Sequence, residues 1–360
     1  MVEGVAPRVD TSPPATPPFF TVVITAYRRR TFLRESVQSV LDQTFPSTSV
    51  EVVVVKDFAD GPIDDWLESL RPKVRVVTED LPLIGQMLAR GLELARGEVT
   101  CFLEDDDRFR PGKLAGLYEL YRPSADLQFV RNAYDAIDEN GDPLPSWERF
   151  RPQAPHPVTW GPGNGRVDLP WLYRYGGYVN LSTMSIRTAL ARRGSSWIRQ
   201  LPASSDVALF LWALGSTGSV RVGNERWNEY RVHPSTSHPV LAAGNEALDV
   251  RDVQRTLVAA RVTQEALAQV PGTDRARPMA AAFRLESATV AFLLERSARL
   301  SFADWLRFAP WFARRRQKYL AGLWAYCLYR WLLPDRAIRS YRARRHGDLR
   351  RAATGAPRAD

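Results

Sequence analysis

The feature of this sequence that most constrains its fold is a run of ten residues, Glu98–Asp107, which reads EVTCFLEDDD. Its first part is mostly apolar and β-prone, the composition of a short strand covered on both faces. The run ends in four consecutive carboxylates, which would repel one another and be costly to desolvate inside a sheet. The acids therefore mark the end of the strand. Pro111 then suits the first turn of a helix that we expect to reach about Tyr121.

Such a strand-to-helix crossing belongs at the carboxyl edge of a sheet, where open α/β folds bind ligands. Clustered carboxylate oxygens suit a hard cation such as Mg²⁺ or Mn²⁺, and such a cation commonly also holds phosphate. Taken alone, the four acids are equally compatible with a solvated loop or with negative charge at a helix N-terminus. The neighbouring segments have to decide between these interpretations.

The segments before the acids alternate between strands and helices. The expected strands are Phe20–Ile24, Val50–Val55, Val74–Thr78 and the strand that ends in the acids, and the expected helices are Thr31–Gln43, Ile63–Leu70 and Gly85–Arg96. This alternation, with strands that are largely apolar, predicts an α/β fold with a mostly parallel sheet flanked by helices. Neither G-x-G-x-x-G nor G-x-x-x-x-G-K-[ST] follows the first strand, which argues against a dinucleotide or P-loop site.

Beyond the acids the pattern is less regular. Residues 127–138 predict another strand. Residues 143–178 are rich in Pro, Gly, Trp and Tyr, show little periodicity and are expected to form a long aromatic loop that binds a ligand. Asp206 opens a strongly apolar helix, and residues 247–269 and 278–300 predict a helical hairpin.

The ends of the chain differ from its body. Residues 1–18 hold five prolines and no basic start followed by an apolar run, so we expect a disordered leader and no secretory signal. The two cysteines, Cys101 and Cys327, lie far apart, which suits a reducing cytosol. The C-terminal tail, residues 301–360, holds 14 Lys/Arg and 4 Asp/Glu, a balance of +10 in a chain whose total is +9.

The tail predicts attachment to a membrane surface. Its apolar segment 319–334 has 16 residues, short of the roughly 20 that span a bilayer. Tryptophans and tyrosines beside clustered arginines are typical of a helix lying in the headgroup layer of an anionic membrane. The alternative is a pair of helices that pack on the body, with a solvated basic end. No nucleic-acid-binding module is recognisable, so we expect no nucleic-acid partner.

With these segments in order, the chain resembles the family 2 glycosyltransferases of the GT-A fold over roughly residues 19–240. The segments that carry the resemblance are Val22–Arg29, similar to V-V-I-P-T-Y-N-R; Phe32–Thr44; Val52–Asp57; Ala95–Leu114, similar to A-x-G-E-(strand)-L-D-x-D-D-x-x-x-P-x-K-L; and, more loosely, Tyr230–Ser237. One such match is weak, but five in the right order are strong. The resemblance implies a donor half (19–125) and an acceptor half (126–240), followed by the hairpin (241–300) and the tail.

The resemblance implies inverting transfer of a sugar from a nucleotide-sugar donor, with UDP as the expected nucleotide and Mg²⁺ or Mn²⁺ neutralising the diphosphate. It makes Asp106 the expected metal ligand, with Asp107 and His233 as further candidates; the alternatives are a helix N-terminal charge for Asp107 and a structural role for His233. Arg231 is expected to pair with phosphate or with an acid of the cluster. The residues expected to bind the donor nucleotide are Thr25, Ala26, Tyr27, Asp57, Glu104 and Asp105.

Inverting transfer also needs a general base that takes the proton of the acceptor hydroxyl. The family position of this acid corresponds to Asp206, although an aspartate at the head of a helix is also suited to be a plain cap. The aromatic loop and the segment 180–185 are expected to shape the acceptor pocket. The residues expected to line it are Trp160, Tyr178, Asn180 and Ser182.

Some positions depart from the family pattern. Lys56 replaces the first acid of the usual D-D pair, and Leu88 and Ala89 stand where Arg and Asn are frequent. The donor therefore stays open, and a non-catalytic sugar-nucleotide-binding or membrane scaffold protein is the rival from another class. Our hypothesis is a cytoplasmic enzyme, peripheral at the inner face of the cell membrane, that acts on a lipid-linked saccharide, a cell-envelope glycan or a small molecule. Transfer to a polyprenyl phosphate is the rival among enzymes.

Overall fold

The computed structural model describes residues 17–161, 167–201, 205–233, 276–295, 297–303, 305–306 and 318–343. The expected helix 247–269 and nearly all of the expected leader lie outside these ranges.

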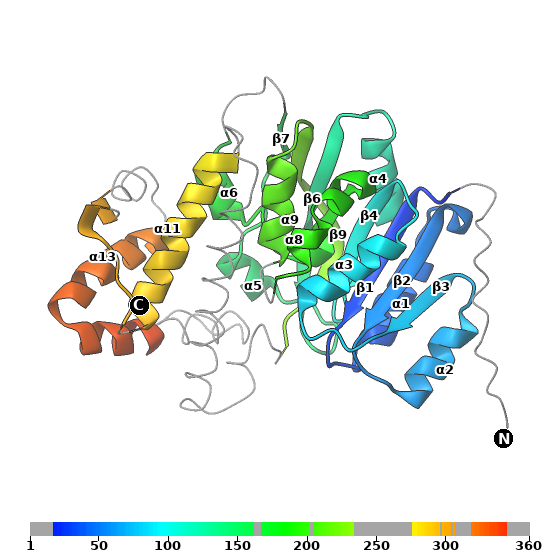
Figure 1. Cartoon of the computed structure of the whole chain (residues 1–360), viewed down its shortest axis with the longest axis horizontal. Helices are drawn as coiled ribbons and strands as arrows, with labels where there is room; N and C mark the ends of the chain where they lie inside the picture. The colour runs from blue at the N-terminus through cyan, green and yellow to red at the C-terminus, as the bar shows by residue number, and fades with distance from the viewer. Residues whose placement is uncertain are drawn as a thin grey trace.

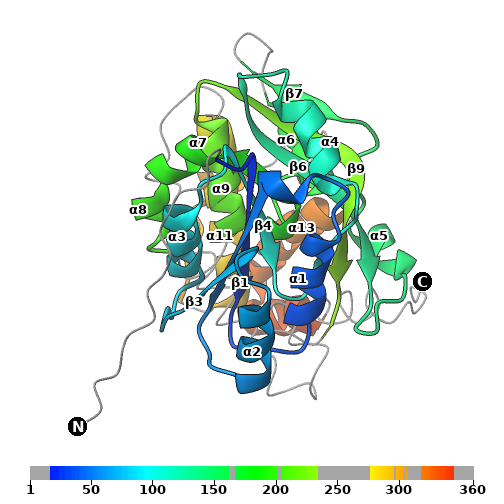
Figure 2. The same ribbon diagram turned by 90° about the vertical axis from the view of Figure 1, so that its right-hand side faces the viewer.

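One nine-stranded sheet organises the molecule (Figures 1 and 2). Its first part has the spatial order β3-β2-β1-β4, and every pairing in it is parallel, as predicted. The strands are β1 (Phe20–Ala26), β2 (Val50–Lys56), β3 (Val74–Thr78) and β4 (Val99–Glu104), and the helices between them are α1 (Leu33–Leu41), α2 (Gly61–Ser69) and α3 (Ile84–Leu94), with a short 3-10 turn η1 (Ser47–Ser49) before β2.

The second part of the sheet is mixed. Strand β8 (Met184–Arg187) lies between β4 and β6 (Leu127–Ile137) and is antiparallel to both, while β9 (Ser219–Arg231) runs parallel to β6. The short strands β5 (Arg108–Phe109) and β7 (Val158–Trp160) both pair antiparallel with β9. The predicted α/β fold with a sheet flanked by helices is confirmed; the first four strands are all parallel, and in the second part only β6 and β9 pair in parallel.

Helices cover both faces of the central strands, and alternate strand residues face two different cores. Val22 and Ile24 of β1 pack in one core together with residues of α1, α2 and α4 (Lys113–Tyr121). Val23, between them, packs on the other face with residues of α3 and α9 (Ser205–Leu214). Because both faces are buried, these strands have the nearly unbroken apolar sequences from which they were predicted.

The segment expected to be a long aromatic loop is more ordered than predicted. Residues 143–178 contain α5 (Pro145–Phe150), β7 and α6 (Leu169–Tyr175). Both helices carry proline in their first turn, and Asp168 caps α6 by accepting a hydrogen bond from the Trp171 backbone N–H at 3.1 Å. The elements are short and begin at prolines, which explains why periodicity alone did not predict them.

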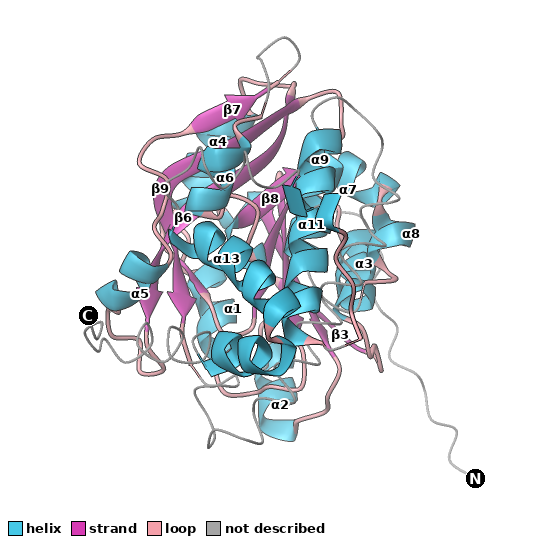
Figure 3. Cartoon of the chain, turned by 90° about the vertical axis from the view of Figure 1, so that its left-hand side faces the viewer, coloured by secondary structure: helices cyan, strands magenta, loops and turns pink. Residues whose placement is uncertain are grey.

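The remaining elements follow in the second half of the chain. They are η2 (Leu181–Thr183), α7 (Thr188–Arg193), α8 (Ser195–Ile198), α11 (Ala276–Leu294) and α13 (Lys318–Leu332). Helix α11 contacts α9, and α13 contacts α11, so the described C-terminal helices form a layer beside the sheet domain (Figure 3). Within the described ranges, no helix combines the length and apolarity needed to cross a membrane.

Candidate active site

The acids lie at the carboxyl edge of the parallel strands. Glu104 is the last residue of β4 and pairs in register with Thr25 of β1, while the next residue of β1, Ala26, pairs with Lys56 of β2. Residues 105–107 then lead from β4 to β5. The sheet therefore brings the first acid beside the turns that follow β1 and β2.

Strand β9 brings a histidine to this edge. The Nε2 atom of His233 lies 3.0 Å from the Oδ2 of Asp106, and the His233 side chain is 6% exposed. The Phe32 ring meets the imidazole edge-on with centroids 4.9 Å apart. Two of the three residues expected to bind metal are therefore in direct contact, although 127 positions separate them in sequence.

The third expected ligand, Asp107, is held differently. It is buried, and its Oδ1 accepts a hydrogen bond from the Arg231 backbone N–H at 2.9 Å, while its Oδ2 has no hydrogen-bond partner within the part of the chain that the structure describes. The Arg231 guanidinium donates to the Asp106 carbonyl at 2.9 Å and pairs with Glu35 at 2.6 Å. Arg231 thus contacts the cluster twice, through its backbone N–H to the Asp107 carboxylate and through its guanidinium to the Asp106 carbonyl; its expected pairing with phosphate stays a prediction.

Burial and mutual repulsion separate the pKa values of the acids. Burial, followed by repulsion from Asp106, raises the pKa of Asp105 to about 7 and that of Asp107 to about 8. The same two causes raise the pKa of Glu104. Burial alone would also raise the pKa of Asp106, but the contact with His233 and the charge of Arg29 outweigh it and lower that pKa. Asp106 is therefore the acid best kept ionised.

The expected base lies on the acceptor side of this cluster. Asp206 stands in the first turn of α9 and accepts hydrogen bonds from the backbone N–H groups of Asn180 at 2.9 Å and Val207 at 2.8 Å. The negative charge of Asp206 helps to raise the pKa of Glu104, so the two carboxylates are close enough to interact electrostatically. Burial raises the pKa of Asp206 itself. The structure therefore brings the expected base and the acids to one region.

The residues expected to bind the nucleotide gather around the turn after β1. Asp57 accepts a hydrogen bond from the Arg28 backbone N–H at 2.7 Å, and the Tyr27 hydroxyl donates to the Pro82 carbonyl at 3.3 Å. Thr25 is buried, with its Oγ1 unpartnered, and Ala26 is fully buried. Glu104 and Asp105 adjoin this turn through the β1–β4 pairing and through Arg29.

The residues expected to line the acceptor pocket differ in how deeply they are buried. Trp160 and Ser182 are buried, and Ser182 accepts a hydrogen bond from the Glu104 backbone N–H at 3.0 Å. Asn180, which has a positive φ of 73°, connects by its backbone to Asp206, and its Nδ2 has no partner. Tyr178 is partly buried against the core around Trp160. Trp160 and Ser182 therefore lie behind the surface, and Tyr178 and Asn180 lie closer to it.

A buried polar network supports the acids from below. The Lys113 ammonium donates to the Ser182 carbonyl at 2.7 Å and to Asn228 Oδ1 at 2.8 Å. Asn228 also accepts from Asn132 and donates to the Ser182 carbonyl. Burial lowers the pKa of Lys113 to about 7. The network joins α4, η2, β6 and β9, so it ties the two parts of the sheet together directly beneath the site.

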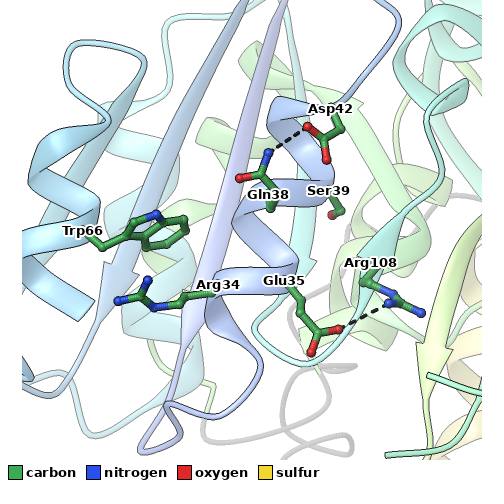
Figure 4. A pocket seen from close by; sticks show the side chains of 7 residues that line it. All are labelled: Arg34, Glu35, Gln38, Ser39, Asp42, Trp66 and Arg108. Carbon is green, nitrogen blue, oxygen red and sulfur yellow. Dashed lines mark hydrogen bonds and ion pairs between the residues drawn. The ribbon is translucent and has the colours of Figure 1, made fainter. Parts of the chain in front are cut away.

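An open groove of about 460 Å³ lies on the outer side of α1 (Figure 4). Its lining residues are Arg34, Glu35, Gln38, Ser39, Asp42, Trp66 and Arg108. None of the expected site residues lines it, but Glu35 connects it to the acids through Arg231. Its two arginines already have partners, because Arg108 pairs with Glu35 and Glu229 and Arg34 stacks on the Trp66 ring.

The carboxylate and imidazole groups at this edge suit a divalent cation that also binds phosphate oxygens. In the described part of the chain, no three His, Cys, Asp or Glu side chains converge in a way that could hold a metal ion. Asp106 and His233 supply two ligand groups, and the Oδ2 atoms of Asp105 and Asp107 are buried without partners. Mg²⁺ is commonly bound by one or two carboxylates plus substrate phosphates, so this set fits such an ion.

Sequence reasoning missed Arg29, Lys113 and Glu35. Arg29 pairs with Asp105 and Asp106, Lys113 joins the buried network, and Glu35 holds Arg231. The only available signal was the position of Arg29 in the turn after β1, at the edge where the acids were expected. Lys113 and Glu35 lie at helical positions, where the sequence pattern fits a solvated side chain as well as a packed one.

The sheet order, the helices on both faces and the acids at the strand ends together define an α/β protein of the GT-A class. Solved structures agree with this fold. The chain superimposes on S. aureus TarS with a TM-score of 0.53 and 17% identity, covering 93% of this chain and 90% of that one. It also superimposes on a Pyrobaculum calidifontis mannosyltransferase, PcManGT, with a TM-score of 0.52 and 13% identity, covering 96% and 89%.

Sequence comparison shows which family the first half of the chain resembles. Residues 21–174 match the model of glycosyl transferase family 2. The chain is 30% identical over 124 residues to an uncharacterised glycosyltransferase of Nostoc, covering 33% of this chain and 38% of the relative. It is 29% identical over 148 residues to the putative teichuronic acid biosynthesis glycosyltransferase TuaG of Bacillus subtilis, covering 40% and 56%. Residues 21–174 are therefore similar to glycosyl transferase family 2, and the chain matches less than two thirds of the length of these relatives.

Proposed function

We propose that this protein is an inverting, divalent-metal-dependent glycosyltransferase that moves a sugar from a UDP-sugar to an acceptor hydroxyl. The observation that carries the proposal is the contact between Asp106 and His233 at the carboxyl edge of the sheet, beside unpartnered carboxylate oxygens. A structural core does not require buried acids without partners, because each such oxygen costs free energy. A site that binds a cation and an anionic nucleotide does require them.

The donor nucleotide would bind at the turn after β1. Asp57, at the end of β2, would accept a hydrogen bond from the base, Thr25 and Tyr27 would line the base pocket, and Glu104 and Asp105 would contact the ribose. Structurally similar proteins support the proposal that the donor is a nucleotide-sugar. TarS was solved with UDP-GlcNAc and with UDP, and PcManGT with GDP-Man and Mn²⁺.

Asp106 and His233 would hold the Mg²⁺ or Mn²⁺ ion, with Asp107 as a further candidate. When bound, such an ion stabilises the negative charge of the departing diphosphate. The contact with His233 and the charge of Arg29 lower the pKa of Asp106 against its burial, which keeps this carboxylate ionised and able to bind a cation. Arg231 contributes by fixing the backbone on which Asp106 and Asp107 are carried.

Asp206 would take the proton of the acceptor hydroxyl as that oxygen attacks the anomeric carbon. Two backbone N–H groups orient its carboxylate, and burial raises its pKa. A raised pKa makes a carboxylate a stronger base. Asn180, whose backbone N–H contacts Asp206, and Tyr178 would line the approach of the acceptor.

The test of the donor and metal roles is a thermal-shift panel of UDP, GDP, dTDP and CDP, each with and without Mn²⁺. We expect UDP to raise the melting temperature strongly only when Mn²⁺ is present, because a ligand that binds the folded state stabilises it by mass action. The matched control is Asp106→Asn, which should lose the effect of Mn²⁺. No response to any nucleotide would contradict the proposal and favour the non-catalytic scaffold.

We further propose that the tail places the enzyme at the inner face of the cell membrane. Among the described residues, every exposed large apolar side chain lies in the tail; these are Phe302, Leu306, Leu328, Leu332 and Leu333. The Phe302 ring stacks on Trp305 at 5.2 Å and approaches Trp331 at 5.9 Å, which joins the two tail segments into one aromatic and apolar surface. Arg336 and Arg339, both exposed, follow Leu333 within six residues of the chain.

An apolar surface beside unshielded arginines complements a bilayer that carries anionic headgroups. A lipid-linked saccharide or a cell-envelope glycan under assembly would then be within reach, and a small-molecule acceptor remains the third class. Extraction of the radiolabelled product distinguishes the rival reaction, since transfer to a polyprenyl phosphate yields a phospholipid-linked monosaccharide. A labelled oligosaccharide or polymer would support the proposed acceptors.

A further inference from the structure

Three consecutive arginines follow β1, and only the middle one turns inward. The side chains of Arg28 and Arg30 are 70% and 53% exposed, whereas that of Arg29 is 24% exposed. Arg28 has a φ of 56°, in the left-handed region, and its backbone N–H is held by Asp57. This non-glycine residue holds a disfavoured conformation, and the side chain that follows it, Arg29, points toward the acids.

Arg29 lies against the two acids next to the expected metal ligand atoms. Its Nη2 is 2.5 Å from Asp105 Oδ1 and 2.8 Å from Asp106 Oδ2, and its Nη1 is 3.1 Å from His233 Nε2. Although burial opposes it, the attraction of Asp106 and Asp105 raises the pKa of Arg29. The guanidinium therefore uses the same Asp106 oxygen that His233 contacts and that a cation would need.

The contacts of Arg29 are incomplete. The Nε2 atom of His233 cannot both donate to Asp106 and accept from Arg29, so one of these two contacts is unsatisfied in either tautomer. Among the described residues, the buried Nε of Arg29 has no acceptor, and Asp105 and Asp107 each keep one oxygen without a hydrogen-bond partner. One positive charge thus only partly compensates four adjacent acids.

We propose that Arg29 is an exchangeable counter-cation of the acid pair Asp105/Asp106, which a divalent ion displaces from Asp106, and that the displaced guanidinium binds the donor's diphosphate. The inference rests on the proposed function and adds a positioning residue to it. Two cations on one carboxylate oxygen repel each other, so the metal and Arg29 exclude one another there. A guanidinium binds phosphate oxygens in a bidentate manner, so the diphosphate offers it a better partner and completes its unused donors.

The inference predicts that Arg29 makes metal binding depend on the nucleotide. The wild-type protein should bind Mn²⁺ weakly by itself and more tightly with UDP, because UDP removes the competing guanidinium. Arg29→Gln should bind Mn²⁺ alone on the order of tenfold more tightly than the wild type and should lose most of the enhancement by UDP. Arg29→Lys keeps the charge and should retain weak binding of Mn²⁺ alone.

The experiment titrates Mn²⁺ into each full-length protein with and without UDP and measures free Mn²⁺ by its electron paramagnetic resonance signal. Arg30→Gln is the matched control, because this neighbouring arginine pairs with Asp60 outside the site and should leave both affinities unchanged. Circular dichroism confirms that each variant is folded; if Arg29→Gln does not fold, Arg29→Lys and Arg29→Met carry the comparison.

Unchanged or weaker binding of Mn²⁺ alone in folded Arg29→Gln, while UDP still enhances binding in the wild type, overturns the inference and leaves the proposed function intact. No binding of Mn²⁺ to the wild type even with UDP overturns the metal-dependent function, and the inference with it. Tighter binding of Mn²⁺ alone together with a reduced UDP effect supports both.

Discussion

The two parts of the sheet differ in strand direction and in how the chain connects their strands. In the first part, which we propose binds the donor and call the donor part, β1 to β4 are parallel and consecutive strands are joined by one helix, with a short turn before β2, although β4 pairs with β1 and not with β3. In the acceptor part, β8 is inserted antiparallel between β4 and β6, and β9 pairs with β5, β6 and β7. The first arrangement carries the acids, and the second brings His233 and Asp206 to them.

The comparison teaches that the acids come from the donor part and that both parts adjust their charge. The acids form one continuous run at the end of β4; besides burial and their own repulsion, Arg29 of the donor part and His233 and Asp206 of the acceptor part shift their pKa values. Changes in the first part should therefore remove a function, and changes in the second part should alter its rate, its pH dependence or the stability of the fold.

The largest effect is expected from Asp106→Ala in the donor part. Loss of this ligand removes several kcal/mol of charge stabilisation from the transition state, so turnover should fall by at least ~10⁴-fold. Sugar transfer measured with Mn²⁺ and a UDP-sugar tests this. Glu119→Ala, an exposed acid on α4, should be unaffected. Turnover within tenfold of the wild type would show that Asp106 does not hold the metal.

A smaller effect, on chemistry alone, is expected from Asp206→Asn in the acceptor part. Loss of a general base should reduce turnover by roughly 10²–10⁴-fold while binding of UDP with Mn²⁺ stays unchanged. Loss of nucleotide binding would instead place Asp206 in the donor pocket.

The same residue sets the pH dependence. Burial raises the pKa of Asp206, and a base works only when ionised, so kcat/KM of the wild type should fall as the pH drops through that raised pKa. This acidic limb should lie above the ordinary aspartate value of about 3.9. In Asp206→Asn the limb due to this group should disappear. An unchanged acidic limb in the variant would assign it to another group.

The boundary between the two parts is tested by Asn228→Ala, which affects stability more than turnover. The variant removes a partner from Lys113, Asn132 and the Ser182 carbonyl, all of which are buried. We expect the free energy of unfolding to fall by about 2–4 kcal/mol in urea denaturation. Asn224→Ala, an exposed asparagine on the same strand, is the control and should change it by less than about 0.5 kcal/mol.

The smallest effect on turnover is expected in the tail. Leu332 is 71% exposed, so Leu332→Glu should fold normally and leave transfer to a soluble acceptor unchanged. Its binding to vesicles that contain anionic lipid should weaken by about tenfold or more, because inserting a leucine contributes about 1.5–3 kcal/mol. Co-sedimentation measures this, with Ala325→Glu, also exposed on α13, as the comparison. Equal binding by both variants and the wild type would contradict the proposed surface.

The sequence by itself determined the donor part and the place of the acids. Apolar runs such as Val50–Val55 and the carboxylates after Leu103 are local signals, and a strand buried on both faces cannot continue into four adjacent charges. Short helical connections then fix parallel pairing and bring the strand ends to one edge. For these reasons β1 to β4 and the expected acid site were predicted close to where the structure has them.

Only the tertiary structure decided which groups meet the acids. His233 contacts Asp106 across 127 positions and Arg29 contacts Asp105 across 76, and no periodicity or spacing encodes such contacts. They depend on the antiparallel insertion of β8, on the length of β9 and on the left-handed backbone of Arg28, because these set where each side chain points. The four acids are adjacent in the sequence, whereas the groups that neutralise them are brought to them only by the tertiary fold.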